Sequence, residues 1–99
     1  MEIKIQSIHF DATEKLQAFI DKKVAKLEKT FEDIQTVEVQ CKVVKPATAQ
    51  NKEVSLTVVV PGNTLHVEKV SDTFEESTDL CVDSMKIQLQ KFKEKLRNR

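Results

Sequence analysis

The chain has 99 residues, of which 39% are hydrophobic and 32% are charged, and its 16 Lys and Arg balance its 16 Asp and Glu. This length and composition predict one domain with a modest core and exclude a membrane-embedded or compositionally disordered protein. With a formal net charge of zero, any binding through charge depends on how the charges are segregated. The N-terminus lacks the basic start and apolar run of a secretory signal, and two cysteines are too few for a disulfide framework or a zinc site. We therefore expect a cytoplasmic protein with reduced thiols and no membrane contact.

The first third of the chain predicts a strand followed by a helix. Residues 1–10 alternate between apolar and polar side chains, as in a half-buried strand. Asp11 is a candidate N-cap for the helix, with Glu14 completing a capping box, and Thr13 is the alternative cap. The helix is predicted to run to about residue 29. Its apolar stripe consists of Leu16, Phe19, Ile20, Val24, Leu27 and Phe31.

Three further strands are predicted in the middle of the chain, over residues 34–45, 53–60 and 64–70, because apolar residues alternate with polar ones in each. Pro46 ends the first of these strands and opens a loop, and residues 61–63 form a tight turn.

Residues 71–99 predict one long helix, since they contain no Gly or Pro and carry apolar side chains at steps of three and four. The apolar stripe consists of Phe74, Thr78, Cys81, Met85, Leu89, Phe92 and Leu96. Acids fill the first half of this helix and bases the second, which suits the helix dipole. Cys81 on this stripe, and Cys41 among the valines of a strand, are expected to be small buried residues.

These elements predict an α+β fold of order β-α-β-β-β-α, with a four-stranded mixed sheet. The first two strands should be parallel because a helix joins them, and the remaining pairs should be antiparallel. Each helix has one apolar stripe and the sheet has one apolar face, so both helices should cover the same face.

The first helix has sorted charges. Lys15, Lys22, Lys26 and Lys29 fall on one flank, and Glu14, Asp21 and Glu28 fall on another. Two interpretations stay open: a solvated face with pairing along the helix, or a binding surface that the basic end of the last helix joins.

Groups suited to catalysis are scarce. His9 and His66 have no nucleophile beside them in a recognisable motif, and no glycine-rich phosphate loop is present. Asp79 and Asp83 share a helix face, but no third metal ligand is suggested. We therefore expect no enzyme activity, no cofactor, no metal site and no small-molecule substrate.

Lysine clusters bind phosphates without reading sequence. The chain has no Trp or Tyr, and its five Phe are expected in the core or in helix staples, which argues against a reader of single strands. The remaining candidates are recognition of the backbone of folded RNA and recognition of a protein partner.

The ordered pattern resembles the short ribosome hibernation promoting factors, also called ribosome-associated inhibitors or sigma-54 modulation proteins, over nearly the whole chain. The residues that carry the resemblance in the first helix are Thr13, Leu16, Phe19, Ile20, Lys23, Lys26, Leu27, Glu28 and Phe31. Those in the strands are Val37, Val39, Lys42, Val43, Leu65 and His66, and those in the last helix are Asp79, Asp83, Gln88, Leu89, Lys91, Lys93, Lys95 and Leu96.

The resemblance implies a fold similar to double-stranded-RNA-binding domains. It also implies a single ribosome-binding domain over residues 1–99, with no C-terminal dimerisation domain. The sequence leaves the oligomeric state open, and we favour a monomer. Such a protein binds the small ribosomal subunit and its rRNA in the channel for mRNA and tRNA, and inhibits translation in stationary phase or starvation. The RNA-binding residues it implies are Lys22, Lys23, Lys26, Lys29, Lys86, Lys91, Lys93 and Lys95. Lys23 lies near the buried flank, so we expect its stem to pack and its ammonium to reach out.

The chain departs from the family pattern at several positions. Ser84 and Ile87 stand where the family has cations, and the family's Tyr near the start of the last helix is absent. Leu80 and Ile87 are predicted on the polar side of that helix, either as scattered surface residues or as a small patch for a partner. The alternatives to a hibernation factor are thus a protein-interaction module and a general binder of double-stranded RNA away from the ribosome. The pattern leaves open whether a hibernation factor of this kind pairs ribosomes or inactivates single ones.

Overall fold

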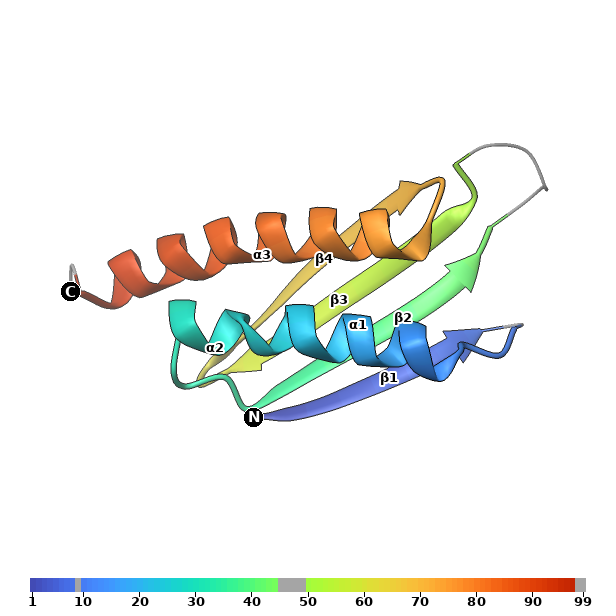
Figure 1. Ribbon diagram of the computed structural model, residues 1–99. Helices are drawn as coiled ribbons and strands as arrows, with labels where there is room; N and C mark the ends of the chain where they lie inside the picture. Colours follow the sequence, from blue (N-terminus) through green and yellow to red (C-terminus); the bar gives the residue numbers. More distant parts are fainter. Residues whose placement is uncertain (9, 45–49, 98–99) are drawn as a thin grey trace.

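A computed structural model describes residues 1–8, 10–44 and 50–97 of the chain (Figure 1). The elements in order are β1 (Glu2–Ile8), α1 (Glu14–Ala25), α2 (Leu27–Thr30), β2 (Thr36–Val43), β3 (Lys52–Val60), β4 (Asn63–Ser71) and α3 (Phe74–Arg97). The strands form one sheet in the order β1-β2-β3-β4, with β1 parallel to β2 and the other two pairs antiparallel. The mixed four-stranded sheet predicted from the alternation is therefore confirmed. His9, the loop residues 45–49 and the last two residues lie outside the described part of the chain.

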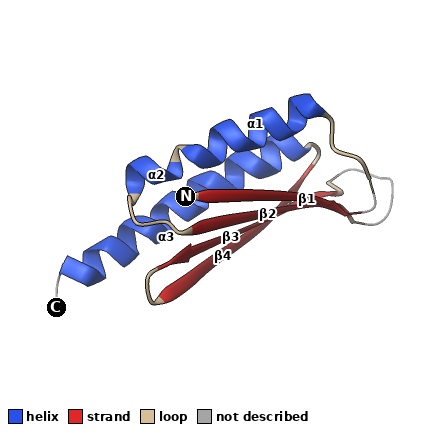
Figure 2. Cartoon of the chain, turned by 90° about the horizontal axis from the view of Figure 1, so that it is seen from below, coloured by secondary structure: helices blue, strands red, loops and turns tan. Residues whose placement is uncertain are grey.

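The helices cover one face of the sheet, as predicted (Figure 2). We call α1 and α2 together the first helical segment, and α3 lies beside it. The covered face is apolar because alternate residues of β2 and β3 point inward, and the helices close over it. Core side chains that are almost completely buried include Ile20, Val24, Leu27, Val37, Val39, Cys41, Val54, Leu56, Val58, Cys81, Met85 and Leu89. The opposite face of the sheet is exposed and polar. His66 lies there, with its Nδ1 2.8 Å from Thr57 Oγ1.

The start of the first helix differs from the preferred prediction. The N-cap is Thr13 rather than Asp11, because Thr13 Oγ1 accepts a hydrogen bond of 3.1 Å from the Leu16 backbone N–H. Both residue types are good caps, and the position of the first turn decides between them. The helix predicted to reach residue 29 is divided. It ends at Ala25, and α2 follows after Lys26, whose N–H bonds the Lys23 carbonyl at 3.3 Å in a tighter turn.

The long helix α3 is attached to the sheet along most of its length. Near its start, Ser77 Oγ donates to the Lys52 carbonyl at 2.6 Å. One turn later Cys81 Sγ lies 3.1 Å from the Val54 carbonyl, and further along Gln88 Nε2 donates to the His66 carbonyl at 3.2 Å. These contacts to β3 and β4 show which flank of α3 faces the edge strand β4.

Two aromatic pairs join α3 to residues that flank α1 and α2, one before α1 and one after α2. Phe10 stacks on Phe74 with ring centroids 4.7 Å apart, and Phe31 meets Phe92 edge-on at 5.5 Å. Both distances lie in the favourable range for aromatic pairs. The prediction that the phenylalanines serve as core or staple residues is consistent with these contacts.

The end of α3 corrects the predicted apolar stripe. Leu96 has the spacing of a core residue, but 46% of its surface is exposed. The reason is visible in Figure 1, where α3 continues past the end of the sheet and leaves its last turns without strands beneath them.

No helix over the described residues is long and apolar enough to cross a membrane.

Candidate nucleic-acid interface

Two ion pairs show how the first helical segment is rotated on the sheet. Lys23 Nζ lies 3.2 Å from the Asp79 carboxylate of α3. On the other flank, Glu28 Oε2 lies 3.9 Å from the N-terminal ammonium of Met1, beside β1. The flank that carries Lys23 therefore faces α3, and the flank that carries Glu28 faces the β1 edge.

This rotation turns the sorted charges of α1 in opposite directions. At about 100° per residue, Lys22 and Lys26 lie on the solvent side of Lys23, whereas Glu14 and Asp21 lie on the opposite flank with Glu28. All of these side chains other than Lys23 are exposed. The lysines thus lie toward α3, and the acids lie toward the β1 edge of the molecule.

Helix α3 contributes cations to the same side. Asp79, Lys86 and Lys93 are spaced by seven residues, so they share one stripe of the helix. Because Asp79 contacts α1, Lys86 and Lys93 on this stripe also face the first helical segment. Figures 1 and 2 show α1 and α3 side by side on the same face of the sheet. We call the surface formed by Lys22, Lys26, Lys29, Lys86 and Lys93 the inter-helix surface.

Lys23 is placed within this surface but is already paired. Its side chain is 32% exposed, and its ammonium lies 5.5 Å from the centroid of the Phe19 ring and 3.2 Å from Asp79. The half-buried side chain is consistent with the expected packing of its stem, but the ammonium is directed to α3 rather than straight to solvent. A carboxylate on the inter-helix surface offsets one of its positive charges.

Lys91 and Lys95 lie apart from the other predicted cations. Lys91 is about 200° around the helix from Lys93, and both Lys91 and Lys95 line a groove beside the β3–β4 turn. The eight predicted residues therefore divide into an inter-helix group and a pair on the β4 flank. The helical wheel of α3 already contained this signal, but only the Asp79 and Gln88 contacts show which flank faces which neighbour.

Neither cysteine offers a reactive thiol. Cys41 and Cys81 are buried as predicted, and burial raises the pKa of the Cys41 thiol to about 11 and that of Cys81 to about 12. Among residues 1–8, 10–44 and 50–97, no group of three or more His, Cys, Asp or Glu side chains is placed to hold a metal ion.

Leu80 and Ile87 are 40% and 55% exposed, as predicted for the polar side of the helix.

The sequence model of the Sigma 54 modulation protein / S30EA ribosomal protein family matches residues 3–97. The chain belongs to this family. The resemblance drawn from the sequence is thereby confirmed. A curated relative in this comparison is a ribosome hibernation promoting factor from Pseudomonas putida, 28% identical over 95 residues, which cover 96% of this chain and 89% of the relative.

Two solved structures share the fold of this family member. A ribosomal subunit interface protein from Coxiella burnetii superposes with a TM-score of 0.85 and 23% identity, covering 95% of this chain and 99% of that one. The N-terminal domain of Protein Y from Thermus thermophilus gives a TM-score of 0.79 and 22% identity, covering 93% and 99%. At these identities the likeness concerns the fold.

Proposed function

We propose that this member of the S30EA family is a ribosome hibernation factor. It binds the small ribosomal subunit in the channel for mRNA and tRNA, and it inhibits translation in stationary phase or starvation by occupying that space. The observation that carries the proposal is the convergence of lysines from α1, α2 and α3 on one side of the molecule. The name of the Pseudomonas putida relative points to the same activity.

The chemistry of the inter-helix surface suits a folded RNA backbone. Lysine ammonium groups neutralise phosphates and release condensed counterions, and this interaction needs no base sequence. Folded RNA presents mainly phosphates, 2′-hydroxyls and a shallow minor groove rather than readable base edges in its deep groove. The acids of α1 face the other way, so a net charge of zero still leaves one side that attracts RNA and one that repels it.

The decisive test is co-sedimentation of the purified protein with isolated subunits and whole ribosomes on gradients at low and moderate salt. The wild-type protein is expected to migrate with the small subunit and whole ribosomes, and to be released as salt rises. The double variant Lys22→Glu, Lys26→Glu should stay at the top of the gradient at salt concentrations where the wild-type protein is bound.

The matched control is Lys4→Glu, Lys42→Glu. Both side chains are exposed on the uncovered face of the sheet, so this variant has the same change in net charge without touching the inter-helix surface. It should bind as the wild-type protein does, apart from a small general loss. Equal loss in both double variants would show that overall charge, not this surface, directs binding.

A second candidate function rests on Leu80 and Ile87, whose exposure on α3 would suit a protein partner. Such an interaction module would remain at the top of the ribosome gradient at every salt concentration. A binder of double-stranded RNA acting elsewhere would shift an RNA duplex with the same salt dependence but would not select the small subunit.

A further inference from the structure

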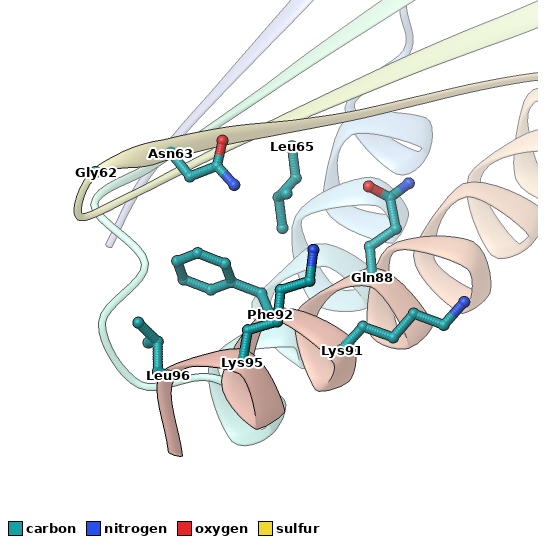
Figure 3. A pocket seen from close by; sticks show the side chains of 8 residues that line it. All are labelled: Gly62, Asn63, Leu65, Gln88, Lys91, Phe92, Lys95 and Leu96. Carbon is teal, nitrogen blue, oxygen red and sulfur yellow. The ribbon is translucent and has the colours of Figure 1, made fainter. Parts of the chain in front are cut away.

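A groove of about 430 Å³ lies between the β3–β4 turn and the last turns of α3 (Figure 3). Its volume falls within the range of about 300–1,000 Å³ that is usual for ligand sites. The turn is tight because Pro61 and Gly62 are the only residues between the paired Val60 and Asn63, and Gly62 adopts a φ of 78°. The groove exists because α3 extends past the end of the sheet, so that the exposed C-terminal part of the helix lies beside the β3–β4 turn.

The inner wall of the groove is apolar. Leu65 of β4 and Phe92 of α3 are partly buried against the core, and Leu96 is 46% exposed at the open end. Phe92 packs its ring edge-on with Phe31 on the core side, and it also lines the groove. Figure 3 shows the side chains of Leu65 and Phe92 directed into the space between the turn and the helix. This wall offers an apolar surface against which a flat ring can lie.

The same groove carries positive charge. Lys91 and Lys95 both line it, and these are the two predicted cations that the fold separates from the inter-helix surface. In Figure 3 the Lys95 side chain rises toward Leu65, whereas Lys91 extends along the helix on the side of Gln88. An occupant that combines a flat apolar part with a negative charge therefore fits the groove better than a neutral one.

Two amide side chains add a donor and an acceptor. Asn63 Oδ1 accepts from the Thr64 N–H at 2.8 Å, which leaves its amide nitrogen as a donor. Gln88 Nε2 donates to the His66 carbonyl at 3.2 Å, which leaves its amide oxygen as an acceptor. Figure 3 shows both of these remaining atoms turned toward the groove. Nucleic acid bases carry donors and acceptors on their edges, so either amide can hydrogen-bond a base in the groove.

We infer that the groove binds one unpaired nucleotide of an RNA strand, with its base against Leu65 and Phe92 and its phosphate at Lys91 and Lys95. The inference rests on the proposed function for the source of the RNA, which is then an exposed loop or bulge of ribosomal RNA. It goes beyond backbone recognition, because the groove selects an unstacked base. It also corrects the sequence-based argument against a reader of single strands, since Phe92, expected only in the core or a helix staple, also lines the groove. Helix α3 contributes cations to both the groove and the inter-helix surface and connects them.

The test uses a single-stranded RNA tetranucleotide and the same strand with its two internal bases removed, each titrated into the isotope-labelled full chain and followed by methyl NMR. The two strands have the same charge, so a difference in affinity reports on the bases. We expect shifts of the Leu65 and Leu96 methyl signals and binding of the intact strand about fivefold or more tighter than the abasic strand. Equal affinities would overturn the inference.

A matched pair of variants locates the base. Leu96→Asp places a carboxylate in the groove, and Ile87→Asp makes the same change at a 55% exposed position of the same helix outside it. Both variants should lose a similar small amount of affinity for the abasic strand. Only Leu96→Asp should lose the preference for the intact strand, and a preference kept in Leu96→Asp would overturn the inference.

Three further outcomes separate this inference from its alternatives. A tetraglutamate peptide can be compared with unlabelled RNA as a competitor of the intact strand. If the peptide displaces the strand as efficiently as the RNA does, the groove is a general site for anions or peptides and the inference is overturned. Base-dependent binding without ribosome co-sedimentation would overturn the proposed function and leave the nucleotide groove standing. If Leu96→Asp and Ile87→Asp bind ribosomes equally and the NMR titration shows no base preference, the nucleotide groove is overturned and the proposed function is kept.

Discussion

The ammonium of Lys23 and the carboxylate of Asp79 lie 3.2 Å apart and join α1 to α3 across the surface where the other lysines converge. The two side chains are 32% and 49% exposed, so water screens the pair and its contribution to stability is small. The pair marks the flank of α1 that faces α3, and its carboxylate places a negative charge among the cations.

The first prediction concerns this carboxylate. Asp79→Asn keeps the shape of the side chain and removes its charge, so the free energy of unfolding should fall by less than about 1 kcal/mol. Ribosome affinity should rise, because Lys23 becomes available to phosphate and a repelling charge is lost. Urea unfolding and gradient sedimentation at rising salt measure the two effects. Asp21→Asn, on the opposite flank of α1, makes the same change in charge away from the inter-helix surface and should change ribosome affinity less. Weaker ribosome binding by Asp79→Asn would show that the pair is needed to position the surface.

The second prediction concerns the number of phosphates contacted. Lys26→Gln should lower the magnitude of the slope of log affinity against log salt by about 1, since each lysine that contacts a phosphate contributes roughly one released counterion. Ribosome binding measured across a salt series gives the slope. Lys42→Gln on the uncovered sheet face should leave it unchanged, and a slope unchanged in Lys26→Gln would remove this residue from the interface.

The strands and the core were predictable because burial imposes a strict period. Val37, Val39 and Cys41 alternate with polar residues, and only one face of a strand reaches the core, so the sequence determined which side chains would be buried. The same reasoning predicted that both helices would share a face of the sheet, since each has one apolar stripe.

The arrangement of the site was less predictable because it depends on contacts between distant residues. The wheel of α1 separates its lysines from its acids, but the contact with Asp79 decides that the lysines face α3. Leu96 shows a related limit. The apolar period of α3 continues past the point where the strands end, and nothing in the helix sequence marks that point. Lys91 and Lys95 are a further example. They lie beside the β3–β4 turn and away from the inter-helix surface, and the sequence of α3 alone does not show where β4 packs.

The third prediction concerns the buried thiols. Burial raises the pKa of Cys41 from 9.0 to about 11 and that of Cys81 from 9.0 to about 12. The folded thiols thus keep their protons at a pH where the unfolded thiols lose theirs. This contribution to stability is complete below about pH 9 and is progressively lost as pH rises toward 11 and 12. The urea midpoint should fall from pH 8 to pH 10, and it should fall less in the variant Cys41→Ala, Cys81→Ala.

The reactivity of the thiols gives an independent check of the same burial. At pH 8 an aromatic disulfide reagent should react with neither cysteine of the folded protein at an appreciable rate, because only the exposed thiolate is nucleophilic. Both thiols should react at once in urea. Rapid reaction of the folded chain would mean that the helices open frequently above Val54 and Cys41.

The last prediction compares two leucines of α3 that are seven residues apart and have the same place in the apolar repeat. Leu89 is fully buried, whereas Leu96 is 46% exposed beyond the end of the sheet. Leu89→Ala should therefore lower the free energy of unfolding by about 2–5 kcal/mol, through lost burial and a cavity. Leu96→Ala should change it by about 0.5 kcal/mol or less. Urea unfolding of both variants measures the difference. A large loss in Leu96→Ala would mean that the last turns of α3 are packed in solution, and a packed Leu96 would close the open end of the groove to a nucleotide.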